Sequence, residues 1–121
     1  MPTEYNADLV KVVDGDTVDV RLDLGFNVWH KCRVRMVGIN APESRTRDLE
    51  EKAKGLAAKE WLKLMLHDEM YEIQMQSQGT GKYGRVLGVL YKDMGKKKPL
   101  NINEEMVKQG HAVVYDGGKR K

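Results

Sequence analysis

Cysteine is nearly absent from this sequence, since Cys32 is the single one among 121 residues. One cysteine excludes an internal disulfide framework and any zinc site built from several cysteines. Long hydrophobic runs are also missing, because no apolar stretch approaches the ~20 residues of a membrane span. Neither sign of charge dominates: 21 Lys and Arg against 18 Asp and Glu leave a net charge of +3. A balance this mild excludes a histone-like polycation and by itself is weak support for nucleic acid binding.

What is present suffices for one folded domain spanning residues 1–121. The hydrophobic fraction is 40%, and Val, Ile, Leu and Met recur throughout, which excludes disorder for most of the chain. Residues 116–121 are expected to form a frayed basic tail. The first residues, Met1 to Tyr5, have neither the basic nor the apolar segment of a signal peptide. We therefore expect a cytoplasmic protein with no membrane partner.

The first third of the chain reads as three strands. Residues 7–13 form a short apolar run, and 17–24 alternate apolar with polar residues, which is the period of a half-buried strand. Asp14-Gly15 predicts the turn between them. A third strand is predicted over about 28–39. Ala41-Pro42 ends it, because proline has no N–H group to donate to a sheet ladder.

Helical spacing begins at Asp48. Asp48 followed by Glu51 predicts a capping box at the start of a helix. The apolar residues that follow form one stripe, which we expect to pack on the sheet. The stripe consists of Leu49, Ala53, Leu56, Ala57, Trp61, Leu64 and Met65.

The rest of the chain returns to strands and ends with a short helix. The order of elements predicts an α+β fold, a five-stranded OB-fold β-barrel with one long and one short helix. The remaining elements are a strand near 71–75, a glycine-rich turn at 79–84, a strand at 85–92, a lysine-rich loop at 95–99, a helix from Asn101 to Gly110 and a last strand within 112–115.

Several features imitate other sites. Residues 79–84 match the letters GxGxxG, but a strand is predicted after them, where a dinucleotide site needs a helix. His30 and Cys32 share one strand face without completing a tetrahedral metal set, so we interpret them as packing residues. Asp14 is interpreted as a turn residue. The run Lys96–Lys98 is more typical of a solvated loop than of a binding surface.

Five residues carry a consistent chemistry. Asp16 has the parity of the buried face of its strand, so its carboxylate needs a partner or a cation. Oxygen ligands such as those of Asp16, Asn40 and Glu43 suit calcium or magnesium. Arg35 and Arg85 suit the oxygens of one phosphate, although arginines on strands usually pair with carboxylates. Glu43 is placed to take a proton from an attacking water, so together these residues describe phosphodiester hydrolysis.

Three segments, in this order, resemble the staphylococcal nuclease (thermonuclease) family. They are Asp-Gly-Asp-Thr at 14–17, Arg-x-x-x-x-Asn-x-Pro-Glu at 35–43 and Tyr-Gly-Arg at 83–85. The resemblance covers about 5–115 and extends to Gly55 and to Asn103-Glu104 and Gln109-Gly110. It implies an OB-fold enzyme that uses Ca2+ and cuts DNA and RNA with little sequence preference, leaving 3′-phosphate ends.

The resemblance also implies a role for each matching residue. Asp16 and Asn40 correspond to metal ligands, Ala41 would offer its backbone carbonyl, and Glu43 corresponds to the general base beside the metal. Arg35 and Arg85 correspond to the phosphate-binding arginines. The residues implied to contact bound nucleotide are Lys82, Tyr83 and Tyr115.

The sequence departs from the family pattern at two points. Position 40 is Asn where the nuclease has Asp, and the chain stops before the family's C-terminal helix. Two hypotheses follow. The first is a calcium-dependent, sugar-nonspecific phosphodiesterase, an endonuclease or exonuclease expected to be a monomer, and it is favoured because both arginines, Asp16 and Glu43 are retained. The second is a catalytically weak or inactive nucleic-acid-binding OB-fold module.

Overall fold

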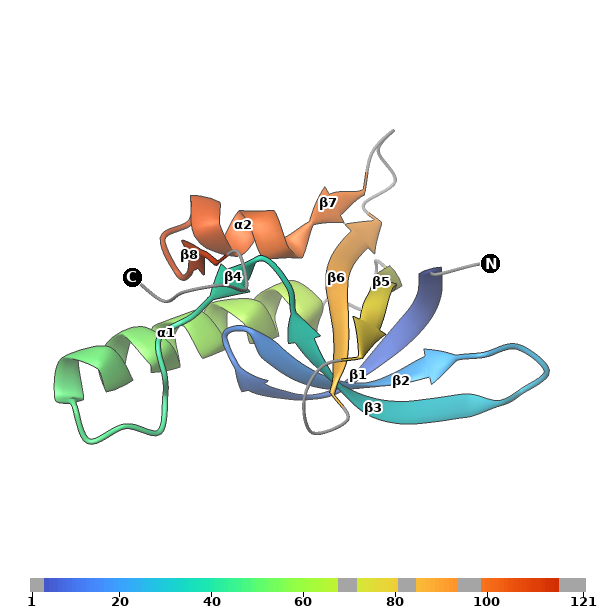
Figure 1. Ribbon diagram of the computed structural model, residues 1–121, viewed down its shortest axis with the longest axis horizontal. Helices are drawn as coiled ribbons and strands as arrows, with labels where there is room; N and C mark the ends of the chain where they lie inside the picture. Colours follow the sequence, from blue (N-terminus) through green and yellow to red (C-terminus); the bar gives the residue numbers. More distant parts are fainter. Residues whose placement is uncertain (1–3, 68–71, 81–84, 94–98, 116–121) are drawn as a thin grey trace.

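A computed structural model describes residues 4–67, 72–80, 85–93 and 99–115. Figure 1 shows the strands forming a curved barrel, with the two helices on different sides of it. Neither helix in these ranges is long and apolar enough to cross a membrane. The elements are β1 (Glu4–Asp14), β2 (Thr17–Asp23), β3 (Trp29–Met36), β4 (Ile39–Asn40), α1 (Leu49–Leu66), β5 (Glu72–Thr80), β6 (Val86–Asp93), β7 (Leu100–Asn101), α2 (Ile102–Lys108) and β8 (Val113–Val114).

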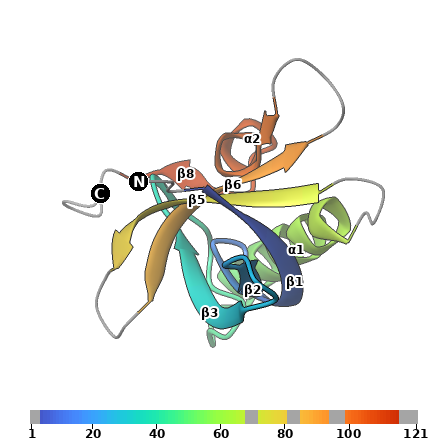
Figure 2. The same cartoon turned by 90° about the vertical axis from the view of Figure 1, so that its right-hand side faces the viewer.

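The barrel closes through a pairing between strands that are distant in sequence. The strand order is β3-β2-β1-β5-β6-β7, and β3 also pairs in parallel with β6, where Val34 lies beside Val86. Strands β1, β2, β3, β5 and β6 therefore form a closed five-stranded barrel, and Figure 2 shows them surrounding a common interior. The predicted α+β OB-fold is confirmed.

The predicted third strand is interrupted. It was expected to run over about 28–39, but β3 ends at Met36 and the chain turns at Gly38, whose φ is +81°. That left-handed backbone is readily adopted by glycine. The residues after the turn form β4, which pairs antiparallel with β8, so that the segment carrying Asn40 leaves the barrel sheet.

The helix α1 begins as predicted, with one half of the capping box. The Asp48 side chain accepts hydrogen bonds from the backbone N–H groups of Glu50 and Glu51. The Glu51 carboxylate accepts from the backbone N–H of Glu43, at 3.3 Å, rather than reaching back to residue 48. The helix start is thereby tied to the loop that precedes it.

The predicted apolar stripe of α1 is wrong in part: Trp61 and Met65 pack against the core, but most of its other members face solvent. Leu49 and Leu64 are 79% and 74% exposed, and Leu56 is also exposed. The first half of the helix packs so closely against the loop backbone that small side chains face inward there, and leucines face inward in the second half. The buried residues of α1 are Gly55, Ala58, Leu62 and Leu66.

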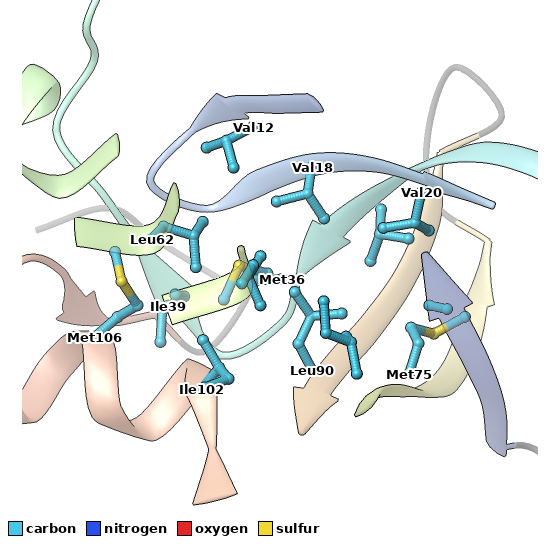
Figure 3. Close-up of a cluster of buried hydrophobic side chains, with 14 of the residues drawn as sticks. Val12, Val18, Val20, Met36, Ile39, Leu62, Met75, Leu90, Ile102 and Met106 are labelled. Carbon is cyan, nitrogen blue, oxygen red and sulfur yellow. The ribbon is translucent and has the colours of Figure 1, made fainter. Parts of the chain in front are cut away.

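The hydrophobic core fills the barrel and continues beneath both helices. Strand residues of alternating parity point inward and meet α1 and α2 residues at one end of the barrel (Figure 3). Its largest fully buried side chains are Met36, Leu62, Met75, Leu90, Ile102, Met106, Val12, Val18, Val20 and Val34.

The short helix α2 is capped at both ends. The Asn101 side chain accepts from the backbone N–H of Glu104 at 3.1 Å. At the other end Gly110 has φ +80°, and the N–H groups of Gly110 and His111 donate to the carbonyls of Val107 and Met106. This is the Schellman arrangement, and the predicted start and stop of the helix are confirmed.

An ion pair on the outer face of β2 and β3 makes stability depend on pH. The Arg33 Nε and Nη2 atoms lie 2.8 and 3.2 Å from the two Asp19 carboxylate oxygens. The hydrogen bond from Arg33 lowers the pKa of Asp19 from its ordinary value. The pair therefore stabilises the fold above pH ~4, the ordinary aspartate range, and this contribution is lost as pH falls through the lowered pKa of Asp19.

We expect Asp19→Asn to remove this dependence. At pH 7 the variant should lose no more than about 1 kcal/mol of unfolding free energy, because the Arg33 side chain is half exposed. The difference between wild type and variant should shrink steadily at acid pH below ~4. Urea unfolding at pH 7 and at a series of acid pH values measures the difference in unfolding free energy between the two proteins. A difference that does not change with pH would contradict a stabilising role of the charged Asp19–Arg33 pair.

Candidate active site

The tight turn between β1 and β2 sets the position of Asp16. A Cβ atom on Gly15 would lie 2.8 Å from the Ala58 Cβ of α1 and 2.9 Å from the Ala41 Cβ beyond β4. Both segments therefore rest directly on this turn, and only glycine leaves them room. The predicted turn is confirmed, with close approach as the reason for its glycine.

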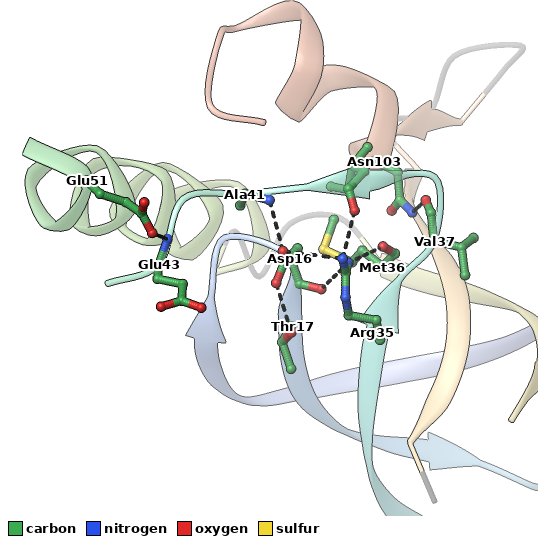
Figure 4. A network of polar contacts seen from close by, with 10 residues as sticks. Asp16, Thr17, Arg35, Met36, Val37, Ala41, Glu43, Glu51 and Asn103 are labelled. Atoms are coloured by element: carbon green, nitrogen blue, oxygen red, sulfur yellow. Dashed lines mark hydrogen bonds and ion pairs between the residues drawn. The ribbon is translucent and has the colours of Figure 1, made fainter. Parts of the chain in front are cut away.

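The Asp16 carboxylate is buried, with the residue 8% exposed, and it has protein partners. It accepts hydrogen bonds from the backbone N–H of Ala41 at 2.9 Å and from the Thr17 hydroxyl at 3.0 Å (Figure 4). A charge with so little exposure requires such compensation. Asp16 thus fastens the β1–β2 turn to the segment that follows β4.

Arg35 lies beside Asp16 and holds the turn between β3 and β4. Its Nη1 donates to the Met36 carbonyl at 2.6 Å and its Nη2 donates to the Ile39 carbonyl at 2.9 Å. Its Nη2 is also 3.6 Å from the Asp16 carboxylate, as Figure 4 shows. Arg35 and Asp16 are brought together as an ion pair, so this arginine supports the backbone as well as supplying charge.

The loop carrying Glu43 is fixed by contacts on both sides. The Ser44 hydroxyl donates to the Asp14 carboxylate at the end of β1. On the other side, a Cβ on Gly55 would lie 2.3 Å from the Glu43 carbonyl oxygen. The Glu43 residue itself is exposed, so its side chain is accessible to solvent while its backbone is held.

Arg85 immediately precedes β6. In the parallel register Leu87 lies beside Arg35, so by strand alternation Arg85 has the parity of the face that carries Arg35. The Nε of Arg85 is buried and has no hydrogen-bond partner among the residues that the structure describes. A buried donor without an acceptor is costly, and a phosphate oxygen is one group that would satisfy it.

The strands β4 and β8 bring Asn40 and Tyr115 to one groove. Asn40 pairs with Val113, and the Tyr115 N–H donates to the Gly38 carbonyl at 2.8 Å. Asn40, Ala41 and Tyr115 all line a groove of about 880 Å³ between this sheet and the start of α1. Lys82, Tyr83 and the run Lys96–Lys98, also singled out from the sequence, lie outside the described residues.

The donor chemistry of this region suits a hard cation. Asp16 and Glu43 offer carboxylate oxygens and Asn40 an amide oxygen, which are the ligand types that calcium accepts. An ionised carboxylate has about four lone-pair positions, so the three contacts of Asp16 leave acceptor capacity. Within the described ranges no three His, Cys, Asp or Glu side chains cluster into a metal-binding group. The types of oxygen donor suit a hard cation, while the described residues place few charged ligands together.

Asn103 has a supporting role that sequence reasoning did not assign. Its side-chain N–H donates to the Val37 carbonyl at 2.9 Å, and its side-chain oxygen accepts from the Leu90 N–H at 3.1 Å. The residue is buried between α2, β6 and the β3–β4 turn. A polar residue two positions after the helix cap Asn101, between the buried apolar residues Ile102 and Met106, was the available signal.

These features define a small closed barrel with a buried carboxylate, one arginine on β3 and a second directly before the adjoining strand β6, an arrangement suited to phosphate groups. Comparison with known proteins agrees with that class. A family described as staphylococcal nuclease homologue matches residues 33–121. This protein belongs to the staphylococcal nuclease family, and the resemblance noted from the sequence is confirmed.

Individual relatives cover nearly the whole chain. Protein ParB of Escherichia coli is 34% identical over 116 residues, covering 93% of this chain and 58% of the relative. The micrococcal nuclease of Shigella flexneri is 32% identical, with 93% and 59% covered, and the thermonuclease of Staphylococcus hyicus is 27% identical, with 90% and 59% covered. The chain therefore spans less than two-thirds of the length of these relatives.

Proposed function

We propose that this protein is a nuclease that hydrolyses phosphodiester bonds in DNA and RNA. The observation that supports this most directly is the buried Arg85 Nε, which has no partner among the described residues and has the parity of the face that carries Arg35. Relatives named micrococcal nuclease and thermonuclease match most of the chain, which supports the same class of activity.

The two arginines would have different tasks. Arg85, whose Nε meets no acceptor in the described part of the chain, would bind a phosphate oxygen through Nε and an adjacent N–H, the paired geometry that a guanidinium offers. Arg35 is held by two backbone carbonyls and the Asp16 carboxylate, so it would present a fixed positive charge to the same phosphate. Donors fixed before the reaction stabilise the charge that grows on the phosphate oxygens at no cost in reorganisation.

Glu43 would act on the attacking water. Its exposed carboxylate would accept a proton from the water as the water oxygen bonds to phosphorus. The bond from phosphorus to the 5′ oxygen would break, and that oxygen would take a proton from solvent and leave as a 5′-hydroxyl, so that the other product ends in a 3′-phosphate. Asp16, Asn40, Glu43 and the Ala41 carbonyl would hold the cation, which we propose is Ca2+. When bound, it would lower the negative charge of the phosphate and orient water.

Residues beyond the catalytic group would hold the rest of the substrate. Lys82 and Tyr83 are proposed to contact the terminal phosphate of a bound nucleotide, and Tyr115 a base. The support for Tyr115 is that it lines the same groove as Asn40 and Ala41.

Cleavage of labelled oligonucleotides tests the function. Single- and double-stranded DNA and RNA are incubated with calcium and then with chelator, and the ends of the products are identified. We expect both DNA and RNA to be cleaved to products with 3′-phosphate ends, and we expect the cleavage to be lost with chelator.

Glu43→Gln serves as the matched control, because glutamine keeps the shape of the side chain but cannot act as a base. This variant should lower kcat more than it changes KM. Binding without cleavage would instead support the inactive OB-fold module, which the Asp16–Arg35 pairing and Asn40 would favour.

The residue at position 40 gives a test of the cation site. Asn40 carries no charge, which leaves only Asp16 and Glu43 as charged ligands. Calcium affinity rises with ligand charge, so Asn40→Asp should tighten calcium binding by roughly tenfold, about 1.4 kcal/mol. Without calcium the same change should lower stability, since like charges would crowd together.

Calorimetric calcium titration of both proteins, with a nucleoside diphosphate present, measures this effect. Urea unfolding in chelator checks the stability change. If Asn40→Asp binds calcium no better than wild type, residue 40 lies outside the cation's ligand set.

A further inference from the structure

The hairpin between β2 and β3 presents an apolar tip to solvent. It projects past the barrel at the end of the molecule away from the start of α1 (Figure 1). Phe26 is 100% exposed and Trp29 46% exposed, and Leu24 and Val28 beside them are about half exposed. A side chain as exposed as Phe26 buries nothing within its own chain, so its apolar surface is available to a ligand.

The backbone of this tip makes phenylalanine an unexpected choice. The turn closes through a hydrogen bond from the Val28 N–H to the Gly25 carbonyl, and both central residues have positive φ, 54° at Phe26 and 63° at Asn27. Turns of this type suit the twist of a hairpin but favour asparagine, aspartate or glycine at these positions. Folding alone therefore gives no reason for an aromatic residue at position 26.

The outer face of β3 connects this tip to the candidate active site. Side chains alternate along a strand, so Trp29, Lys31, Arg33 and Arg35 share one face. The six residue steps from Trp29 to Arg35 span about 20 Å. One aromatic and three cationic residues thus form an unbroken row that ends at Arg35, the arginine proposed to present a fixed positive charge to the phosphate.

The row keeps a net positive charge although two of its three cations are ion-paired, Arg33 with Asp19 and Arg35 with Asp16. Its third cation, Lys31, forms no ion pair with the residues that the structure describes. Asp19 forms the pair with Arg33, and Lys31 and Lys11 also lie close enough to favour its charged form. One carboxylate is therefore faced by three cations. At the end of the row, the Arg21 guanidinium lies 5.6 Å from the centre of the Trp29 ring, which gives that ring a defined neighbour.

We propose that the β2–β3 hairpin is a guide for a single-stranded segment of nucleic acid leaving the active site. The phosphates would follow Lys31 and Arg33, and unpaired bases would stack on Trp29 and Phe26. A charged track combined with aromatic platforms is the usual means of holding single strands. The inference rests on the proposed function, because Arg35 marks where the cut phosphate lies. An anionic membrane would need only the tip, and the cations are instead spread along the strand.

Binding of a fluorescent 12-nucleotide single strand in chelator tests the guide without cleavage. Phe26→Asn and Trp29→Ala should each weaken binding by about tenfold, the usual effect of losing one stacking platform. Lys31→Ala should reduce the slope of log affinity against log salt by about 0.7. Leu64→Ala and Lys52→Ala are matched controls on exposed positions of α1 and should bind as wild type does.

Stability separates a lost contact from a lost fold. Phe26→Asn should unfold at the same or a higher urea concentration, because asparagine is better suited to positive φ and no packing is removed. Weaker binding by a variant at least as stable as wild type would support the guide. Unchanged binding by both Phe26→Asn and Trp29→Ala would overturn it.

Two further assays distinguish this proposal from the proposed function. A dinucleotide bound at Arg35 is too short to reach Trp29, so the hairpin variants should cleave it normally and lose about tenfold in kcat/KM on a 20-nucleotide strand. If wild type cleaves neither substrate, the nuclease function fails while the binding assay still decides on the hairpin. If Phe26→Asn abolishes binding to phosphatidylserine vesicles but not to the oligonucleotide, the tip is a membrane anchor and the guide is overturned.

Discussion

Replacing Gly55 with alanine should destabilise the protein, even though alanine is the better helix former. In the middle of a helix the exchange should by itself gain about 1 kcal/mol. Here the new Cβ would lie 2.3 and 2.4 Å from the carbonyl oxygen and carbon of Glu43 and 2.6 Å from the backbone nitrogen of Ser44. All three are backbone atoms, so no side-chain rotation relieves the overlap. Overpacking costs of 1–3 kcal/mol or more are typical, and we expect a net loss of about 2 kcal/mol.

The same substitution should also impair catalysis. The loop or the helix must shift to admit the methyl group, and the loop carries Glu43. Urea unfolding and oligonucleotide cleavage measure the two effects. Ala57→Gly, at an exposed position of the same helix, is the control for helix propensity and should lose about 1 kcal/mol without affecting kcat. A Gly55→Ala protein as stable and as active as wild type would show that the close approach is not maintained.

Arg85→Lys should lower kcat by at least ~10²-fold with little change in stability. The Nε of Arg85 has no partner among the described residues, so its removal breaks no hydrogen bond that the structure shows. Lysine keeps the charge but lacks the planar pair of donors that fits two phosphate oxygens. The loss should therefore appear in the reaction and not in folding.

Arg35→Lys is the informative comparison. Lysine cannot reproduce both contacts of the guanidinium to the Met36 and Ile39 carbonyls, so this variant should lose stability as well as activity. Urea unfolding and steady-state kinetics of both variants test the contrast. If Arg35→Lys and Arg85→Lys changed the free energy of unfolding equally, the two arginines would not have the different tasks proposed. Full activity of Arg85→Lys would contradict its role in binding the phosphate.

Periodicity predicted the barrel strands and both helices because each element buries one face. It failed for the packing face of α1, where the exposed side carries Leu49 and Leu64 and the buried side carries Gly55 and Ala58. A hydrophobic stripe indicates what favours burial, whereas this helix is selected for close approach to a loop backbone. The buried residues Ala58, Leu62 and Leu66 also have helical spacing, so the sequence holds two overlapping apolar stripes. Which stripe faces the barrel is decided by the close approach at Gly55, and that depends on tertiary structure. The turn at Gly38, which separates β3 from β4, was not predicted for a similar reason. A single glycine within an alternating segment does not distinguish a turn from a continuous strand.

The candidate site could be predicted in part. The parity of Asp16 correctly indicated a carboxylate in need of compensation. The identity of its partners could not be predicted, because the N–H of Ala41 reaches it only after β4 has left the barrel sheet. The same turn creates the carbonyl contacts of Arg35 and the contacts of Asn103. The functions assigned to Asn40, Glu43 and Tyr115 stay predictions.

The parallel contact between β3 and β6 has a consequence for the order of folding. Neighbouring strands β1, β2 and β3 can pair while little of the chain is ordered, whereas the β3–β6 contact joins segments separated by α1 and β5. Closing such a long segment costs more chain entropy and is expected late. Because Arg35 lies on β3 and Arg85 immediately precedes β6, a partly synthesised chain that lacks β6 would have a β-meander but would not hold the two arginines together as the proposed phosphate site requires. Activity should therefore appear only when the barrel closes.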